Sequence, residues 1–334
     1  MRQPKLFLHL PEYICTPDSM DIDKDGSLVL SCPNFAEPKT SSGCVVRISK
    51  DERKVTKWFD VPVHPVTKVA RNMGIAVIHK KDEIYDVYLC DNQGWSGDEA
   101  LVFKGRMLKV TMDGDKIVKW VTMADNMEHP NGVRYKDGYI YVTQSLMVNV
   151  KDPGGKLVSG VYRFHEDDEN IDVKNTLEDK NLLCTFITEN PECQYGADGI
   201  AFDKDGNLYV GNFGDGSVFR IVLSDDGSVV ENKLWSQDQA QCQTCDGMIF
   251  DDAGNLYIAD FSANSIARVS PDGKKVERLA QSPDKSGFGG GLEQPGEPII
   301  YDGKIVASCF DLVTGPDKIN TGHEMPATLA YLDM

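Results

Sequence analysis

The sequence predicts an all-β protein, a six-bladed β-propeller built from four-stranded antiparallel blades. A short phrase recurs six times along the 334 residues and begins a strand each time. Successive copies start 48 to 67 residues apart, inside or slightly above the spacing of propeller blades. Glycine-containing turns separate the strands that follow each copy. The six phrases begin at Asp18, Met73, Asn131, Asp198, Asp246 and Glu297.

Each repeat supplies the strands of one blade in order, the recurring phrase being the first. Second strands are expected at Ser27–Leu30, Tyr85–Leu89, Tyr139–Val142, Asn207–Val210, Asn255–Ile258 and Lys304–Ala307. Third strands are expected at Gly43–Ile48, Arg106–Val110, Gly160–Phe164, Ser217–Ile221 and Ser265–Val269. Fourth strands are expected at Val55–Phe59, Ile117–Val121, Leu182–Ile187, Val229–Leu234 and Val276–Leu279.

Asp-Gly pairs stand in the connections between these strands. Both residue types tolerate a positive φ, which tight hairpin turns require. The pairs are Asp25-Gly26, Asp113-Gly114, Asp137-Gly138, Asp205-Gly206, Asp226-Gly227 and Asp272-Gly273.

The sixth repeat holds only three strands before the chain reaches Met334, and the strand-like segment Lys5–Leu10 belongs to no repeat. This segment is therefore expected to complete the sixth blade. Pairing the two ends of the chain closes the ring and covers sheet edges that would otherwise stay open. No composition shift or linker divides the chain, so residues 1–334 are expected to form a single domain.

Charge and composition exclude several classes of partner. The net charge of −17 opposes binding to nucleic acid and to anionic membrane surfaces. No apolar run approaches the roughly 18 residues that span a bilayer, and Met1–Lys5 lacks the apolar core of a secretory signal. We expect a cytoplasmic protein that is a monomer or a weak homo-oligomer.

The nine cysteines contain one CxxC pair, Cys242 and Cys245, and no second pair. A single pair is weak evidence for zinc or redox chemistry. Small buried core residues in a mostly reduced protein are the favoured interpretation. A disulfide, with Cys193 as a further candidate, is the alternative.

The starts of the inner strands should form a ring around one mouth of the propeller. Five of the six ring positions carry a side-chain oxygen, and four are carboxylates. Crowding carboxylates together costs free energy unless a positive charge neutralises them. All-oxygen ligation suits a hard cation such as Ca²⁺ or Mg²⁺. The competing interpretation is that Asp198-Gly199 and Asp246-Gly247 are ordinary turns.

The sequence resembles the SMP-30/gluconolactonase/luciferin-regenerating-enzyme family of six-bladed propellers over nearly its whole length. The most specific matches are residues 196–214, GADGIAFDKDGNLYVGNFG, and residues 245–260, CDGMIFDDAGNLYIAD, with Pro130-Asn-Gly-Val as a shorter one. The resemblance implies a catalytic divalent cation held by Asp18, Asn131, Asp198 and Asp246. Asp18 replaces a usual Glu, and Asp198 replaces a common Asn. His129 stands where sugar-lactone hydrolases tend to have Arg, which disfavours an aldonolactone substrate and leaves other lactones open.

The activity implied by the resemblance is metal-dependent hydrolysis of a lactone or another small ester. Ca²⁺ is the favoured cation, with Mg²⁺, Mn²⁺ or Zn²⁺ as alternatives. Asp246 or Asp198 would be the general base, Asp246 being preferred because it follows the family pattern. His129, Tyr195 and Glu297 are expected to contact the substrate or line its pocket.

Two other functions remain open at this point. One is a non-catalytic propeller of the NHL type in which the cation is structural. The other is hydrolysis of phosphotriesters or fluorophosphates at the same site. Long connections could form a lid over the mouth, with Trp95, Phe35, Leu146, Met147 and Tyr195 as its apolar walls, or could be plain surface insertions.

Overall fold

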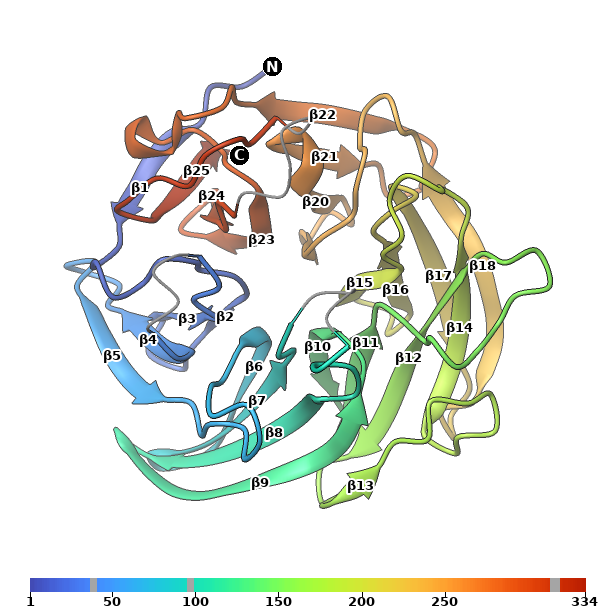
Figure 1. Ribbon diagram of the computed structural model, residues 1–334. Coiled ribbons are helices and arrows are strands. Elements are labelled where there is room, and N and C mark those ends of the chain that lie inside the picture. Colours follow the sequence, from blue (N-terminus) through green and yellow to red (C-terminus); the bar gives the residue numbers. More distant parts are fainter. Residues whose placement is uncertain (37–40, 95–98, 313–318) are drawn as a thin grey trace.

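The computed structural model describes residues 1–36, 41–94, 99–312 and 319–334. Six antiparallel sheets stand around a central axis as the blades of a propeller (Figure 1). Regular helix in the described residues is limited to two short 3₁₀ turns, η1 (Phe261–Ala263) and η2 (Gly287–Gly289). None of the described helical segments is long and apolar enough to cross a membrane.

Blades one to three follow the order expected from the repeats. The first contains β2 (Met20–Ile22), β3 (Leu28–Cys32), β4 (Cys44–Ile48) and β5 (Val55–Asp60). The second contains β6 (Asn72–Lys81), β7 (Ile84–Asp91), β8 (Gly105–Asp113) and β9 (Lys116–Met127). The third contains β10 (Pro130–Lys136), β11 (Tyr139–Gln144), β12 (Leu157–His165) and β14 (Leu182–Thr188).

Blades four to six complete the ring. The fourth contains β15 (Ala197–Phe202), β16 (Leu208–Asn212), β17 (Ser217–Leu223) and β18 (Val229–Gln237). The fifth contains β19 (Met248–Phe250), β20 (Leu256–Asp260), β21 (Ser265–Val269) and β22 (Val276–Gln281). The sixth contains β23 (Pro295–Tyr301), β24 (Lys304–Cys309), β25 (Thr328–Asp333) and, from the other end of the chain, β1 (Lys5–His9).

The N-terminal strand closes the ring as the sequence predicts. β1 pairs antiparallel with β25, with Lys5 opposite Tyr331 and His9 opposite Thr328. The two chain ends therefore lie in one blade (Figure 1). One feature was not predicted: β13 (Ile171–Asp172) adds to β9 in parallel, so the second sheet has a fifth strand.

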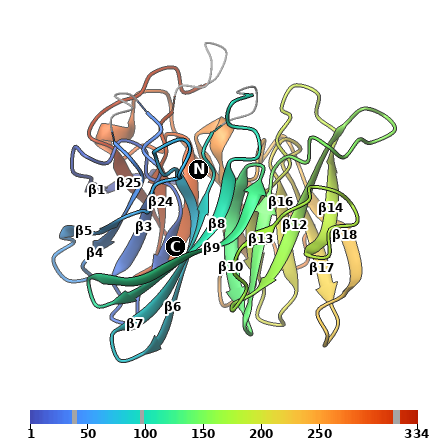
Figure 2. The same ribbon diagram turned by 60° about the horizontal axis from the view of Figure 1, so that its bottom comes forward.

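The expected turns are confirmed. The glycines of all six Asp-Gly connections have positive φ, from 57° at Gly114 to 84° at Gly206. Turned by 60°, Figure 2 shows the strands running between the two faces of the ring, with hairpins such as β6–β7 and β17–β18 at its lower end.

The hydrophobic core lies between neighbouring blades. All five residues of β16 and all five of β20 are buried because these strands are covered by a blade on each side. The outermost strands are more exposed; β18, for example, exposes Val230 and Leu234. Cys242 and Cys245 belong to one such cluster, with their Sγ atoms 4.0 Å apart, in agreement with their interpretation as core residues.

Candidate metal centre on the propeller axis

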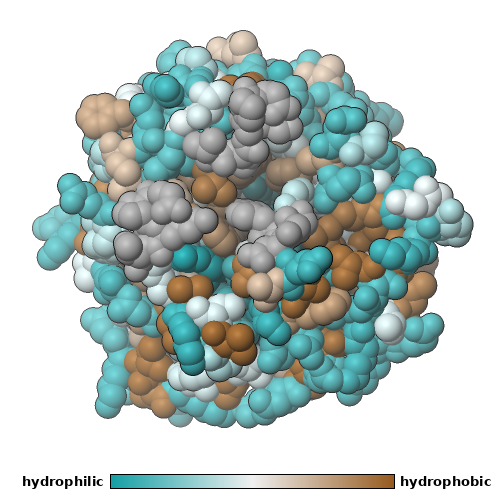
Figure 3. All heavy atoms as spheres, viewed as in Figure 1, coloured by the Kyte–Doolittle hydropathy of each residue, from teal (hydrophilic) through white to brown (hydrophobic). Residues whose placement is uncertain are grey.

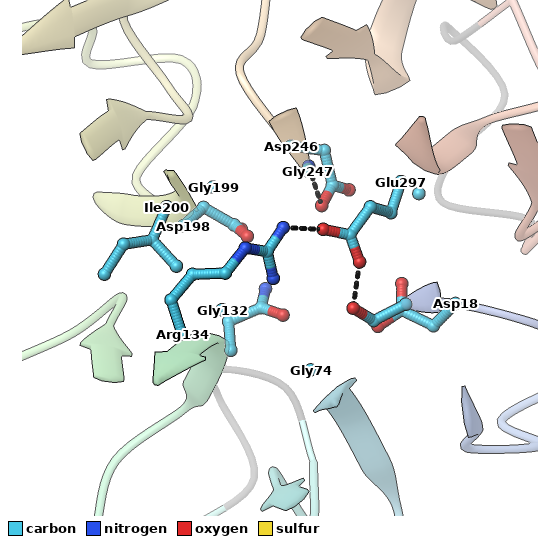
Figure 4. A pocket seen from close by; sticks show the side chains of 13 residues that line it. Asp18, Gly74, Gly132, Arg134, Asp198, Gly199, Ile200, Asp246, Gly247 and Glu297 are labelled. Carbon is cyan, nitrogen blue, oxygen red and sulfur yellow. Dashed lines mark hydrogen bonds and ion pairs between the residues drawn. The ribbon is translucent and has the colours of Figure 1, made fainter. Parts of the chain in front are cut away.

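The starts of the inner strands meet around one small cavity, as the repeat predicts. Asp18 lies two residues before β2 and Asp246 two residues before β19, whereas Asn131, Asp198 and Glu297 lie near the starts of β10, β15 and β23. All five line a cavity of about 10 Å³ on the axis (Figure 4). A space of this size holds about one water molecule.

The sixth ring position, Met73 on β6, does not line this cavity. It packs instead in an apolar cluster with Phe35 and Phe310. The oxygen-bearing side chains of the ring therefore come from five blades. The second blade contributes the apolar side chain of Met73, which lies outside the cavity.

The glycines that follow the ring residues allow the inner strands to approach one another. A Cβ on Gly74 would lie 2.1 Å from the carbonyl oxygen of Asn131, and one on Gly199 would lie 2.1 Å from that of Asp246. Gly132 and Gly247 are restricted in the same way by the next blade. Asp198-Gly199 lies inside β15, so its interpretation as an ordinary turn is wrong. Asp246-Gly247 directly precedes β19, and Gly247 lacks the positive φ of the six Asp-Gly turns.

Three ring carboxylates are buried without a positive partner. Asp18, Asp198 and Asp246 are 4%, 5% and 8% exposed. Within the described part of the chain, no Lys, Arg or His side chain forms an ion pair with any of them. Burial raises the pKa of each, and neighbouring carboxylates raise it further. Hydrogen bonds to the side chains of Asn131 and Asp246 partly oppose this rise in the pKa of Asp198.

Arg134 is a residue of this site that the sequence analysis missed. It extends from β10 into the centre of the channel, and its guanidinium forms an ion pair with Glu297 (Figure 4). Its side chain remains 24% exposed, although it lies inside the channel. Burial opposes its charge, but Glu297 and Asp21 outweigh that effect and raise the pKa of Arg134.

Arg134 and Asp21 lie one step further along the inner strands than the ring residues, and spacing along the strands could have indicated them. Arg134 follows the ring residue Asn131 by three positions, as Asp21 follows Asp18. Asp21 accepts a hydrogen bond from the Val77 backbone N–H at 2.7 Å, which joins the first two blades. Burial raises its pKa to about 6.

Both carboxylate oxygens of Glu297 already have partners. Oε1 contacts Arg134, and Oε2 accepts hydrogen bonds from the Ser19 hydroxyl and, at 3.0 Å, from the Met20 backbone N–H. Glu297 thus lines the cavity as expected, but its oxygens hold the first, third and sixth blades together. A contact between Glu297 and substrate would have to replace one of these bonds.

The remaining donor set suits a hard cation in its chemistry. Asp18, Asn131, Asp198 and Asp246 offer only oxygen atoms, and their carboxylates are desolvated and uncompensated. In the described residues, however, no three His, Cys, Asp or Glu side chains stand close enough together to hold a metal ion. These four residues would hold the cation, and their side chains would have to draw together around it.

His129 and Tyr195 lie next to each other near the cavity. Their rings are 6.1 Å apart, and they precede the ring residues Asn131 and Asp198 by two and three positions. His129 is 7% exposed, and burial lowers its pKa to about 4, so its imidazole is neutral at pH 7. Its Nε2 atom is buried without a hydrogen-bond partner in the described structure.

The other residues proposed as apolar walls are placed as follows. Phe35, Leu146 and Met147 are buried, and Tyr195 is half-buried. Trp95 lies outside the described residues.

Comparisons with known proteins agree on the fold. The chain is similar to a luciferin-regenerating enzyme, with 13% identity, a TM-score of 0.66 and coverage of 100% of this chain and 96% of that one. It is also similar to the calcium-binding protein regucalcin from Agrobacterium tumefaciens, with 12% identity, a TM-score of 0.61 and coverage of 99% and 93%. A third similar structure is a virginiamycin B lyase from Staphylococcus aureus, with 13% identity, a TM-score of 0.55 and coverage of 99% of this chain and 100% of that one.

At such low identity these likenesses show the fold alone, and the three proteins bear different functional names. No curated protein matches the chain. The family model for the SMP-30/gluconolactonase/LRE-like region matches residues 131–287, which include Asn131, Asp198 and Asp246. The resemblance predicted from the sequence is therefore confirmed for residues 131–287, which match the model of the SMP-30/gluconolactonase/LRE-like region and include the third, fourth and fifth blades.

Proposed function

We propose that this protein is a divalent-cation-dependent hydrolase that opens a lactone at the axial carboxylates. One observation carries the proposal: Asp18, Asp198 and Asp246, from three different blades, are buried together without a positively charged partner among the described residues. Such an arrangement is unfavourable unless a cation compensates it. The gluconolactonase-like region over residues 131–287 and the likeness to a calcium-binding regucalcin support Ca²⁺ and an ester substrate.

Asp18, Asn131, Asp198 and Asp246 would hold the cation. When bound, a hard divalent ion polarises an ester carbonyl and lowers the pKa of water. Asp246 is held in place because its Oδ1 accepts a hydrogen bond from the Gly247 backbone N–H at 2.9 Å. Asp246 and Asp198 interact with each other through their side chains, and Asp198 also interacts with Asn131. Either carboxylate could take a proton from an attacking water, and Asp246 is preferred because it follows the family pattern.

The neutral imidazole of His129 is a candidate for a hydrogen bond with the substrate. It has a free nitrogen that can either donate or accept a hydrogen bond, depending on its tautomer. Its place beside Tyr195 suits a polar contact with the substrate, which would orient the ester toward the ring.

The test is hydrolysis of a panel of lactones, from aldonolactones to apolar aromatic ones, by EDTA-treated protein. Each lactone is assayed without metal and with Ca²⁺, Mg²⁺, Mn²⁺ or Zn²⁺. Asp246→Ala should lose at least about 100-fold in kcat, the scale of a lost general base. Asp252→Ala, which removes an exposed carboxylate from the same blade, is the matched control and should keep full activity.

Turnover that needs metal and disappears only in Asp246→Ala would support the proposal. If phosphotriesters react and lactones do not, the site is a hydrolase of another ester class. If calorimetry shows tight cation binding but no ester is hydrolysed, the cation is structural and the protein is a binding propeller.

A further inference from the structure

Five aromatic side chains form a continuous arc near the axial cavity. Adjacent members have ring centroids 6.1 Å, 5.8 Å, 5.7 Å and 6.3 Å apart. In order along the arc they are Tyr195, Phe213, Phe261, Phe310 and Phe35. This set is called the aromatic arc below.

Strand direction places the aromatic arc at the mouth where the carboxylates lie. Phe213, Phe261 and Phe310 directly follow the second strands β16, β20 and β24. A second strand runs antiparallel to the inner strand, so its last residue lies opposite the inner strand's first. Asn212 indeed pairs with Ala197, and Cys309 pairs with Pro295.

The aromatic arc also reaches the ring of inner-strand starts. Phe35 and Phe310 pack with Met73, the ring member that carries no oxygen, and Phe261 and Leu312 pack against this cluster. Apolar packing is thus continuous from the aromatic arc to the level of the carboxylates; Phe35, Phe310 and Met73 are buried in it, so a ligand would contact the other three rings of the aromatic arc. In the space-filling view down the axis, hydrophobic residues lie among hydrophilic ones on this face (Figure 3).

The size of the cavity fixes where the body of a substrate must lie. About 10 Å³ holds roughly one water molecule and is too small for a lactone ring. Everything except the reacting group must therefore rest outside the ring of carboxylates, against the side chains that border the mouth. Phe213, Phe261 and Tyr195 are half-buried there and keep part of their rings accessible.

The chemistry of the aromatic arc discriminates between classes of lactone. A polyhydroxylated lactone loses free energy for every hydroxyl that is desolvated without a hydrogen-bond partner. The aromatic arc supplies one hydroxyl, that of Tyr195, and otherwise only carbon. A flat apolar group instead gains stacking or edge-to-face contacts with these rings.

We propose, on the basis of the lactonase function above, that the substrate carries an aromatic or similarly flat apolar group that binds the aromatic arc. Its ester reaches the carboxylate ring from this position, and no sugar-like lactone is preferred.

The first measurement compares dihydrocoumarin, an aromatic lactone, with glucono-δ-lactone. Dihydrocoumarin should have a kcat/KM at least about 100-fold higher. Phe213→Ala and Phe261→Ala should each raise its KM about tenfold, the scale of one ring face removed from contact, with kcat within about twofold. Phe261→Leu, which keeps most of the volume, guards against a folding defect and should give a smaller rise in KM.

Phe288→Ala is the matched control. This phenylalanine is 62% exposed and stacks on His9 in the sixth blade, away from the aromatic arc, so its removal should leave KM unchanged. A preference for glucono-δ-lactone, or equal effects of Phe288→Ala and Phe261→Ala, would overturn the inference and leave the lactonase function standing.

A binding measurement separates this inference from the proposed function. Dihydrocarbostyril, the amide counterpart of dihydrocoumarin, resists hydrolysis and can be titrated by calorimetry into wild-type protein, Phe213→Ala and Phe261→Ala. If no lactone is hydrolysed but this amide binds and the two variants weaken it about tenfold, the lactonase function fails and the aromatic arc is a binding site. If the amide does not bind the wild-type protein, the inference is wrong.

Discussion

The guanidinium of Arg134 lies against the carboxylate of Glu297 on the propeller axis and links the third blade to the sixth. This ion pair divides the acidic residues of the channel into two groups. Glu297 is compensated from within the chain, whereas Asp18, Asp198 and Asp246 form no ion pair with a basic side chain of the described residues.

Arg134→Met should destabilise the protein by about 2 kcal/mol, because it leaves the carboxylate of Glu297 buried without its charged partner. Urea unfolding in the presence of EDTA measures this. Adding Glu297→Gln to Arg134→Met should restore part of the loss, since the uncompensated charge is removed. A double variant that is less stable than the sum of the single variants would show that the pair does not act through charge.

Asp198→Asn should raise the melting temperature of EDTA-treated protein at pH 8, because one buried, mutually repelling carboxylate is removed. The same variant should gain less from Ca²⁺. At 100 times the dissociation constant, Ca²⁺ stabilises wild-type protein by about 2.7 kcal/mol. Thermal melts with and without Ca²⁺ give both quantities, and an unchanged Ca²⁺ increment would exclude Asp198 as a ligand.

Gly199→Ala should cost about 1–3 kcal/mol of stability, because its Cβ would lie 2.1 Å from the Asp246 carbonyl oxygen and push two inner strands apart. Activity should fall as well, since Asp198 and Asp246 flank the contact. Gly289→Ala is the control: no atom lies within 4 Å of its added Cβ. Chemical denaturation and the lactone assay report the two effects, and equal behaviour of the two variants would contradict this role of Gly199.

Deleting residues 1–10 should destabilise the whole ring. The deletion removes β1 and with it the buried side chains of Phe7 and Leu10, each worth about 1.5–3 kcal/mol. Lys5→Ala, which removes an exposed ion pair with Asp333 and a contact of the ammonium group with the Tyr331 ring, should destabilise the protein far less than the deletion. Calorimetry distinguishes a single unfolding transition at a lower temperature from separate unfolding of the sixth blade. An unchanged melting temperature would contradict closure of the ring by β1.

Glu293 should make stability fall as the pH rises. Burial and then the nearby Asp311 raise its pKa to about 7, from an ordinary value of 4.5. Its contribution to stability is therefore present at pH 4.5 and lost between there and pH 7. Glu293→Gln should melt within a degree or so of wild type near pH 5 and a few degrees higher near pH 8. A constant difference across this range would rule out the titration of Glu293 as the cause.

The repeat predicted most of the fold because each blade restates the same local pattern. Ser217–Ile221 was expected as a third strand and lies within β17, and Gly227 has the positive φ that its turn was expected to need. β13 could not be foreseen: two residues carry no periodicity, and they pair only because their connection passes β9.

The axial carboxylates were predictable because their positions repeat, whereas the ion-pair partner of Glu297 was not. The ion pair between Arg134 and Glu297 joins residues 163 positions apart, and a lone Arg on a strand gives no sign of its partner. The part played by Gly199 was also hidden, because an Asp-Gly pair has the same letters in a turn and at a close contact between strands.

Closure of the ring by β1 also has a consequence for synthesis. β1 is made first but pairs with β25, which is made last, with Lys5 opposite Tyr331. While the chain grows from the ribosome, the apolar face of β1 must wait for its partner, and the loop that finally closes includes nearly every residue. Contacts of such long range form slowly and leave an open strand edge that invites aggregation. Chaperones that hold exposed strands should therefore raise the yield of this protein more than they raise that of a protein whose first strand pairs at once.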